Sequence, residues 1–112
     1  FPPQIQLLLN GIKNDGRKRA LMILISFFKS LGVSEEELER RILEWNKKNY
    51  QPLKEGYIRS QLIWYRKNPN RLPPNFDNPI YRDLGVDKPD ELSRKVKNPV
   101  NYTIKKHFQN KN

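Results

Sequence analysis

The sequence contains no cysteine and a single histidine, His107, among its 112 residues. The absence of thiols excludes disulfide bonds, thiolate zinc sites and iron–sulfur clusters held by cysteine. One histidine near a polar C-terminus also argues against a histidine-based metal site and a Ser-His-Asp triad. No nucleophile–base pair, carboxylate metal cluster or phosphate-binding glycine loop is recognisable. We therefore expect a protein that is not an enzyme and that carries no metal or cofactor.

Long apolar runs are absent as well. None approaches the roughly 18 residues that a membrane-spanning helix requires, and the opening Phe1, Pro2 and Pro3 do not have the basic start of a secretory signal. These two absences predict a soluble, cytoplasmic protein. The length suits one domain over residues 1–112, in which the order of the last few residues is left open.

Acidic residues are few in comparison with basic ones. The chain has 22 lysines and arginines against 12 aspartates and glutamates, which gives a formal net charge of +10. Such a charge steers polyanions to the surface and raises their local concentration. Nucleic acids and nucleotides are therefore the expected partners. The alternative is a soluble basic protein whose charge has no specific partner.

Apolar spacing predicts a mainly α-helical core in the first two thirds of the chain. The strongest pattern lies in residues 17–31, where apolar residues recur at spacings of three, four and three, as on one face of a helix. These residues are Leu21, Leu24, Phe28 and Leu31. Gly32 follows them in the position that glycine commonly takes after a helix C-terminus. Shorter or more polar helices are predicted for residues 4–9 and 55–67.

A further helix is predicted to begin after Gly32. Ser34 followed three residues later by Glu37 has the pattern of a capping box. Leu38, Ile42 and Trp45 then share one helical face, which we expect to be buried.

The character of the chain changes after residue 67. Three prolines and three asparagines within residues 68–75 are incompatible with a continuous helix. Short helices are predicted around residues 80–84, 90–96 and 100–108. The expected fold is thus a compact helical domain with an irregular, Pro/Asn-rich C-terminal third wrapped over its core.

Arg17, Lys18 and Arg19 form an electrostatic anomaly at the start of the helix predicted for residues 17–31. A helix N-terminus carries a partial positive charge, so that three successive cations there oppose the local field. A bound anion would reverse this effect, because the free backbone N–H groups, the helix dipole and two guanidinium groups together favour phosphate. The sequence therefore predicts a phosphate site, and a solvated basic turn is the alternative.

Two other places combine cations with apolar or aromatic residues. Lys29 lies twelve residues beyond Arg17 in an otherwise apolar run, either as a snorkelling side chain or as part of the same phosphate surface. Trp64 is followed by Arg66 and Lys67 on a helix whose other face carries the apolar residues. An exposed aromatic ring beside cations favours stacking of a nucleic-acid base. The alternative is that Trp64 covers the edge of the core.

Five short segments carry a resemblance to a known family. They are the opening Phe-Pro-Pro-Gln-Ile, residues 27–36, Leu-Pro-Pro-Asn-Phe at 72–76, Asp-Glu-Leu-Ser at 90–93 and Asn-Pro-Val-Asn-Tyr at 98–102. In the same order they resemble segments of the C-terminal iron–sulfur domain of archaeal and eukaryotic DNA primase large subunits. The counterparts there are Phe-Pro-Pro-Cys-Ile, an apolar helix with its Gly-hydrophobic-Ser/Thr-x-Glu continuation, Pro-Pro-Ser-Cys, Asp-Glu-Leu-Cys and His-Pro-Leu-Asn-Tyr.

The chain departs from this family at the cluster cysteines. The resemblance aligns them with Gln4, Phe76, Ser93 and a position near Val86, and no cysteine is present. It therefore implies the same domain without its cluster, with the space at Phe76 filled by ordinary packing. Such a domain is similar to the small non-catalytic third subunit of some archaeal primases.

The resemblance also implies roles for individual residues. In the family, this domain binds the triphosphate of the initiating nucleotide, and later the primer 5′ end, together with nearby template. Triphosphate contacts are implied for Arg17, Lys18, Arg19, Lys29 and Trp45. Template contacts are implied for the fourth predicted helix, near Gln61 and Trp64.

These observations predict a non-catalytic accessory subunit of a DNA primase. Its expected partners are the primase catalytic and large subunits, the DNA template, the RNA or DNA primer and the initiating nucleoside triphosphate, with no membrane. Two alternatives remain open. One is a basic module that coats nucleic acid without regard to its ends, and the other is a scaffold that bridges primase subunits.

Overall fold

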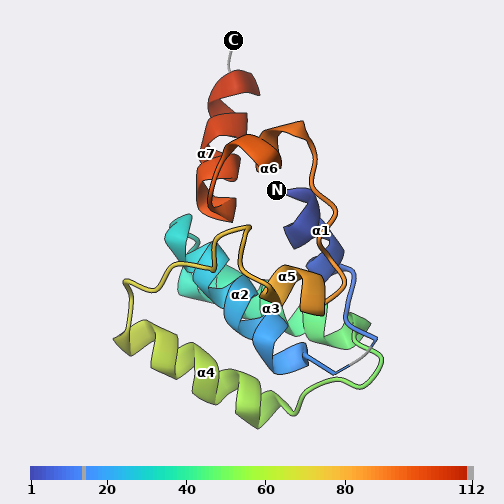
Figure 1. Cartoon of the computed structure of the whole chain (residues 1–112). Helices are drawn as coiled ribbons and strands as arrows, with labels where there is room; N and C mark the ends of the chain where they lie inside the picture. The colour runs from blue at the N-terminus through green and yellow to red at the C-terminus, as the bar shows by residue number, and fades with distance from the viewer. Residues whose placement is uncertain (14, 111–112) are drawn as a thin grey trace.

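The computed structural model describes residues 1–13 and 15–110, and within them the chain forms seven α-helices and no strand (Figure 1). The helices are α1 (Pro3–Leu9), α2 (Arg17–Ser30), α3 (Glu35–Lys48), α4 (Glu55–Lys67), α5 (Ile80–Asp83), α6 (Glu91–Lys95) and α7 (Pro99–Asn110). The prediction of a mainly helical chain is confirmed. In the described part of the chain, no helix has the length and apolar character needed to cross a membrane. Residues 111–112, at the end whose order was left open, lie outside the described residues.

Helix α2 is the centre of the fold. It packs against α1, α3, α4 and α7 (Figure 1), and these neighbours bury residues on most of its circumference. The buried apolar residues are Ala20, Leu21, Ile23, Leu24, Ile25, Phe27 and Phe28. A helix that is apolar nearly all round is stable only when it is covered, which explains why the other helices are arranged about it. Gly32, with φ of +80°, follows the end of α2 as predicted.

Helix α3 begins at the serine cap that the sequence indicates, although the capping box is incomplete. The Ser34 hydroxyl accepts a hydrogen bond from the Glu37 N–H at 3.2 Å. The Glu37 carboxylate, however, bonds to Arg40 and Arg41. The Arg40 guanidinium holds the pKa of Glu37 below its ordinary value. The face predicted to be apolar is buried, as expected.

The C-terminal third is irregular between its short helices, as predicted, and Asn98 anchors it. The side-chain amide of Asn98 donates to the Pro73 carbonyl at 2.8 Å and to the Asn75 side-chain oxygen at 2.9 Å. Close by, the Phe76 N–H donates to the Lys97 carbonyl at 2.7 Å. These bonds join the Pro/Asn-rich segment to the start of α7. They also satisfy backbone polar groups that have no hydrogen-bond partner within a helix.

Asp90 holds the junction between α6 and α7. Its carboxylate caps α6 by accepting the Ser93 N–H at 2.8 Å, and it accepts the Tyr102 hydroxyl of α7 at 2.5 Å. Burial tends to raise the pKa of Asp90, but the hydrogen bonds from Tyr102 and Ser93 outweigh it and leave the pKa below its ordinary value. Burial and the bond to Asp90 raise the pKa of Tyr102 to about 12. The folded state therefore favours the charged carboxylate and the neutral phenol.

We expect Asp90→Ala to lower the free energy of unfolding by about 1–3 kcal/mol at pH 7, because it removes a helix cap and an acceptor for Tyr102. Since the folded-state pKa of Asp90 is lowered, its contribution is full above the ordinary value of 3.8 and is lost as the pH falls through the folded-state value. Urea unfolding at pH 7 and at about pH 2 measures both effects, with the exposed Asp87→Ala as control. A difference between wild type and Asp90→Ala that persists undiminished in acid would contradict this account.

Candidate nucleotide and nucleic-acid interface

The start of α2 has charges that a helix N-terminus disfavours. Its N-cap, Gly16, has φ of +114°, no side chain caps the helix, and the first turn holds Arg17, Lys18 and Arg19 without an acid. Ala20 is the first residue whose N–H bonds within the helix, to the Gly16 carbonyl at 2.9 Å, so the preceding N–H groups have no helical acceptor. By contrast, α3 begins with a serine cap and three glutamates. The start of α2 therefore favours an anion through both its dipole and its side chains.

The cations at the start of α2 spread over three neighbouring segments. The Arg17 guanidinium donates to the Gln51 carbonyl in the loop after α3. The Lys18 ammonium lies 4.7 Å from the centre of the Tyr57 ring on α4, a cation–π contact. Successive helical residues differ by about 100° in direction, which explains why three adjacent side chains diverge. They surround the helix start and do not converge on one point.

Arg19 makes an exposed contact on the third side. Its guanidinium lies 3.7 Å from the Asp83 carboxylate of α5, with the two side chains 49% and 54% exposed. Such a pair contributes about 0–1 kcal/mol, so it does not prevent Arg19 from turning toward another anion. Arg17 also has five N–H donors and uses one of them on Gln51. Both arginines therefore keep donors available for a phosphate group.

One face of α4 extends this basic region along the surface. Tyr57, Gln61 and Trp64 recur at spacings of four and three on α4. Trp64 is 43% exposed, and the Arg71 guanidinium carbon lies 5.2 Å from its ring centre. We call Lys18, Tyr57, Gln61, Trp64 and Arg71 the α2–α4 face. Aromatic rings flanked by cations form the kind of surface on which single-stranded nucleic acid stacks.

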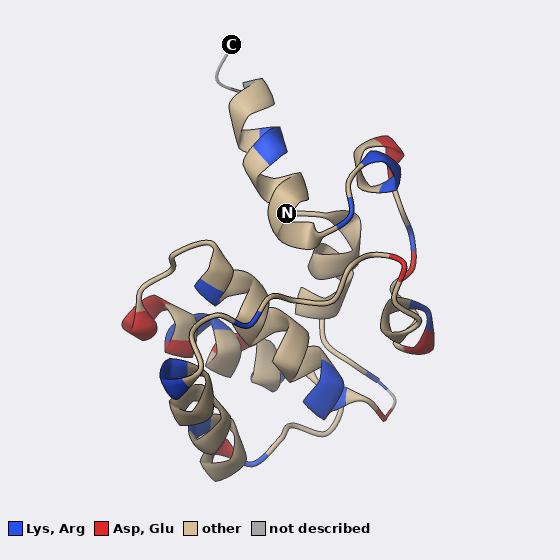
Figure 2. Ribbon diagram, turned by 60° about the vertical axis from the view of Figure 1, so that its left-hand side comes forward, with Lys and Arg blue, Asp and Glu red and all other residues tan. Residues whose placement is uncertain are grey.

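Two members of this face, Tyr57 and Arg71, are not among the residues predicted from the sequence. Tyr57 lies one helical turn before Gln61, so the spacing within α4 was the signal that could have found it. Arg71 lies in the irregular segment after α4, where no periodicity exists, and only the fold brings it to Trp64. Figure 2 shows basic segments at the start of α2 and along α4, on elements that are far apart in the sequence.

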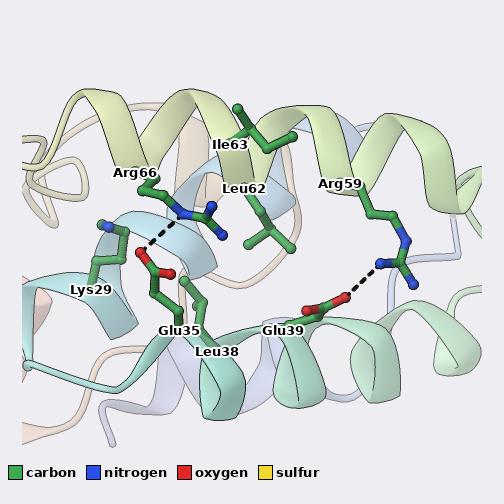
Figure 3. Close-up of a pocket in the computed structure, with 8 residues that line it drawn as sticks. All are labelled: Lys29, Glu35, Leu38, Glu39, Arg59, Leu62, Ile63 and Arg66. Carbon is green, nitrogen blue, oxygen red and sulfur yellow. Dashed lines mark ion pairs between the residues drawn. The ribbon is translucent and has the colours of Figure 1, made fainter.

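Arg66 does not lie on the α2–α4 face, which corrects the prediction that it flanks Trp64. Its guanidinium bonds to the Glu35 carboxylate of α3 at 3.0 Å, and Arg59 pairs in the same way with Glu39 (Figure 3). The physical reason is that a residue two positions after Trp64 is turned about 200° around the helix. Lys67, three positions after Trp64, is exposed and lies within about 60° of it.

Lys29 lies in a groove between α3 and α4, away from the start of α2. The groove is lined by Lys29, Glu35, Leu38, Glu39, Arg59, Leu62, Ile63 and Arg66 (Figure 3). Twelve helical residues separate Lys29 from Arg17, which is about 18 Å along α2. The prediction that the two side chains reach one phosphate surface therefore does not hold for this arrangement. Its place beside Glu35 favours the role of a partly covered groove residue.

Trp45 is a core residue, which corrects its assignment to the nucleotide site. It is 1% exposed, and its indole N–H donates to the Leu8 carbonyl at 2.9 Å. The Leu8 carbonyl also accepts the Gly11 N–H at 3.1 Å, so the indole is an additional donor that joins α1 to α3. A side chain in this position has no surface on which a nucleotide could stack.

The positions that the family resemblance aligns with cluster cysteines are filled by packed side chains. Gln4 and Ser93 are buried and meet through a contact of 3.5 Å between the Gln4 amide nitrogen and the Ser93 hydroxyl. Phe76 packs on Tyr81 with ring centres 5.9 Å apart, and Val86 is buried in the core. The Gln4 side-chain oxygen is buried without a hydrogen-bond partner. Among the described residues, no group of three histidine, aspartate or glutamate side chains is placed to hold a metal ion.

Comparisons of the chain with protein-family models, with curated proteins and with solved structures give no match. The family resemblance therefore rests on the sequence segments described above. The charges and contacts at the start of α2 and on the α2–α4 face are the structural features that bear on function.

Proposed function

We propose that this chain is a non-catalytic accessory subunit of a DNA primase that holds the 5′-triphosphate of the initiating nucleotide at the start of α2. The observation that carries the proposal is the uncapped first turn of α2, with Arg17, Lys18 and Arg19 and no acid. Phosphate oxygens accept hydrogen bonds from free helix N–H groups and from arginine forks. A triphosphate has enough oxygens to engage side chains that spread around the helix start.

The α2–α4 face extends this site in the direction of a nucleic-acid strand. Lys18 belongs both to the first turn of α2 and to the contact with Tyr57, so it connects the phosphate site to α4. Bases of a template or primer would stack on Trp64, while Arg71 lies next to that ring and supplies positive charge. The arrangement suits a ligand with a charged 5′ end and an adjoining single or paired strand.

The mechanism is one of positioning. Formation of the first dinucleotide requires two nucleotides and a template to meet at once. A subunit that holds one nucleotide by its triphosphate and the template nearby makes this encounter effectively intramolecular, which lowers its entropic cost. The chemistry takes place on a separate catalytic subunit. The same contacts would keep hold of the 5′ end while the primer grows.

The juxtaposition of Gln4 and Ser93 also supports this proposal. The two residues are 89 positions apart in the chain, yet their side chains are in contact in the interior. Both stand where the family resemblance aligns cysteines that share one cluster. Their proximity is what a cluster-free form of that domain requires.

We expect fluorescence anisotropy at moderate salt to show at least tenfold tighter binding of a primer–template with a 5′-triphosphate than of one with a 5′-hydroxyl. Tenfold corresponds to about 1.4 kcal/mol. The double variant Arg17→Ala/Arg19→Ala removes this preference, because it removes both guanidinium groups at the α2 start. With the primase catalytic and large subunits present, the same variant weakens initiation more than extension.

The matched control is Arg94→Ala/Lys95→Ala on α6, which removes two positive charges away from the start of α2 (Figure 1). It should keep the triphosphate preference. Trp64→Ala should weaken binding of the primer–template by about 1–3 kcal/mol, whether its 5′ end carries a triphosphate or a hydroxyl. Equal affinity of the wild type for the two ends would overturn the triphosphate site in favour of a general coating protein, which the net charge of +10 otherwise favours. Unchanged initiation by the double variant in an assembled complex would indicate a scaffold.

A further inference from the structure

The outer half of α7 projects from the body of the molecule (Figures 1 and 2). Val100 and Tyr102 near its start are buried, whereas every residue from 104 to 109 is exposed. A short helix without packing partners is marginal in water. A partner that covered the protruding turns would therefore stabilise them.

This outer half carries exposed apolar side chains on one side. Ile104 is 47% exposed and Phe108, one turn further, is 61% exposed. At the base of the helix, a shallow hollow is lined by Val96, Lys97, Asn101, Ile104 and Lys105. We call Val96, Lys97, Ile104, Lys105 and Phe108 the α7 surface. Val96, Ile104 and Phe108 are its apolar residues, Lys97 lies at the base of α7, and Lys105 follows Ile104.

The charge of the α7 surface indicates which class of partner would bind it. No aspartate or glutamate occurs after Glu91, while Lys97, Lys105 and Lys106 lie in or next to the surface. A second copy of this chain would bring like charges together. A phosphate backbone would match the lysines but would leave Ile104 and Phe108 without apolar contacts. A protein groove with an apolar floor and carboxylates on its rim matches both features.

We propose that α7 is the docking element of this chain and inserts Ile104 and Phe108 into an apolar, acid-rimmed groove on another protein; resting on the function proposed above, that protein is the catalytic or the large primase subunit. The position of α7 fits this role. It lies at the opposite end of the molecule from α4, and the longest dimension of the molecule is 41 Å (Figure 1). Docking through α7 therefore leaves the start of α2 and the α2–α4 face open to nucleotide and template.

The test measures binding of the full chain to the purified pair of catalytic and large primase subunits from the same organism, by biolayer interferometry. We expect Ile104→Asp and Phe108→Asp each to weaken binding at least tenfold, because each places a carboxylate against an acidic, apolar groove. Lys105→Glu should also weaken binding, because it places a carboxylate against the acidic rim of the groove. The matched control is Leu72→Asp, an exposed apolar residue outside α7 (68% exposed), which should bind as the wild type does.

The outcomes separate this inference from the proposed function. If the wild type does not bind the subunit pair, both the partner and the proposed function are overturned. If it binds and the α7 variants bind equally well, only the docking role of α7 is overturned. Circular dichroism shows whether the variants fold, and their triphosphate preference should equal that of the wild type. Loss of primer–template affinity in Ile104→Asp, with subunit binding intact, would show a nucleic-acid surface instead and overturn the inference.

Discussion

Trp45→Ala should lower the free energy of unfolding by about 3–5 kcal/mol, a large share of the total stability of a domain of this size. The side chain is fully buried between α1 and α3, so its removal leaves a cavity that the surrounding helices fill only in part. It also leaves the Leu8 carbonyl without the indole N–H that it accepts at 2.9 Å. Urea or thermal unfolding followed by circular dichroism measures the loss.

The other tryptophan provides the control. Trp64→Ala removes the same side chain from a partly exposed position on α4, and we expect a loss of stability of about 1 kcal/mol or less. The two variants should therefore have opposite profiles: Trp45→Ala affects stability, and Trp64→Ala affects primer–template affinity. If Trp45→Ala were as stable as wild type but lost nucleotide affinity, Trp45 would belong to the ligand site after all.

The helical core could be predicted because its signals are local. The apolar residues of α2 recur at helical spacing, Ser34 marks the start of α3, and Gly32 separates the two helices. Even the burial of Trp45 was indicated, since it continues the apolar face of α3. Its assignment to the nucleotide site rests on the family resemblance alone.

The candidate site could be predicted only in part, because its pairs are distant in the sequence. The anomaly at Arg17 and Arg19 depends on the start of one helix, and it is therefore visible in the sequence. The contact of Lys18 with Tyr57 joins two helices, and that of Arg71 with Trp64 depends on the path of an irregular segment. For Arg66, the spacing within α4 could have shown that it is turned about 200° from Trp64, but only the fold reveals that its partner is Glu35 on another helix. No spacing rule within one segment reveals such partners.

Gly11→Ala should lower the free energy of unfolding by more than about 3 kcal/mol, for two additive reasons. Gly11 has φ of +99°, a conformation that is strained for alanine. In addition, the new Cβ would clash with the Lys48 carbonyl oxygen at the end of α3. Because that atom belongs to the backbone, the clash cannot be relieved by turning a side chain. Either the backbone at Gly11 or the end of α3 must move.

Gly32→Ala separates the two contributions, because Gly32 also has positive φ, +80°, but no atom within 4 Å of the added Cβ. It should cost only the backbone strain, about 1–2 kcal/mol. Urea unfolding of the two variants measures the difference, which represents the contact between Gly11 and Lys48. Equal losses of unfolding free energy in the two variants would mean that the end of α3 moves away from the new Cβ at no energetic cost. A larger loss for Gly11→Ala would show that Gly11, just after α1, is held against the end of α3 by close backbone packing.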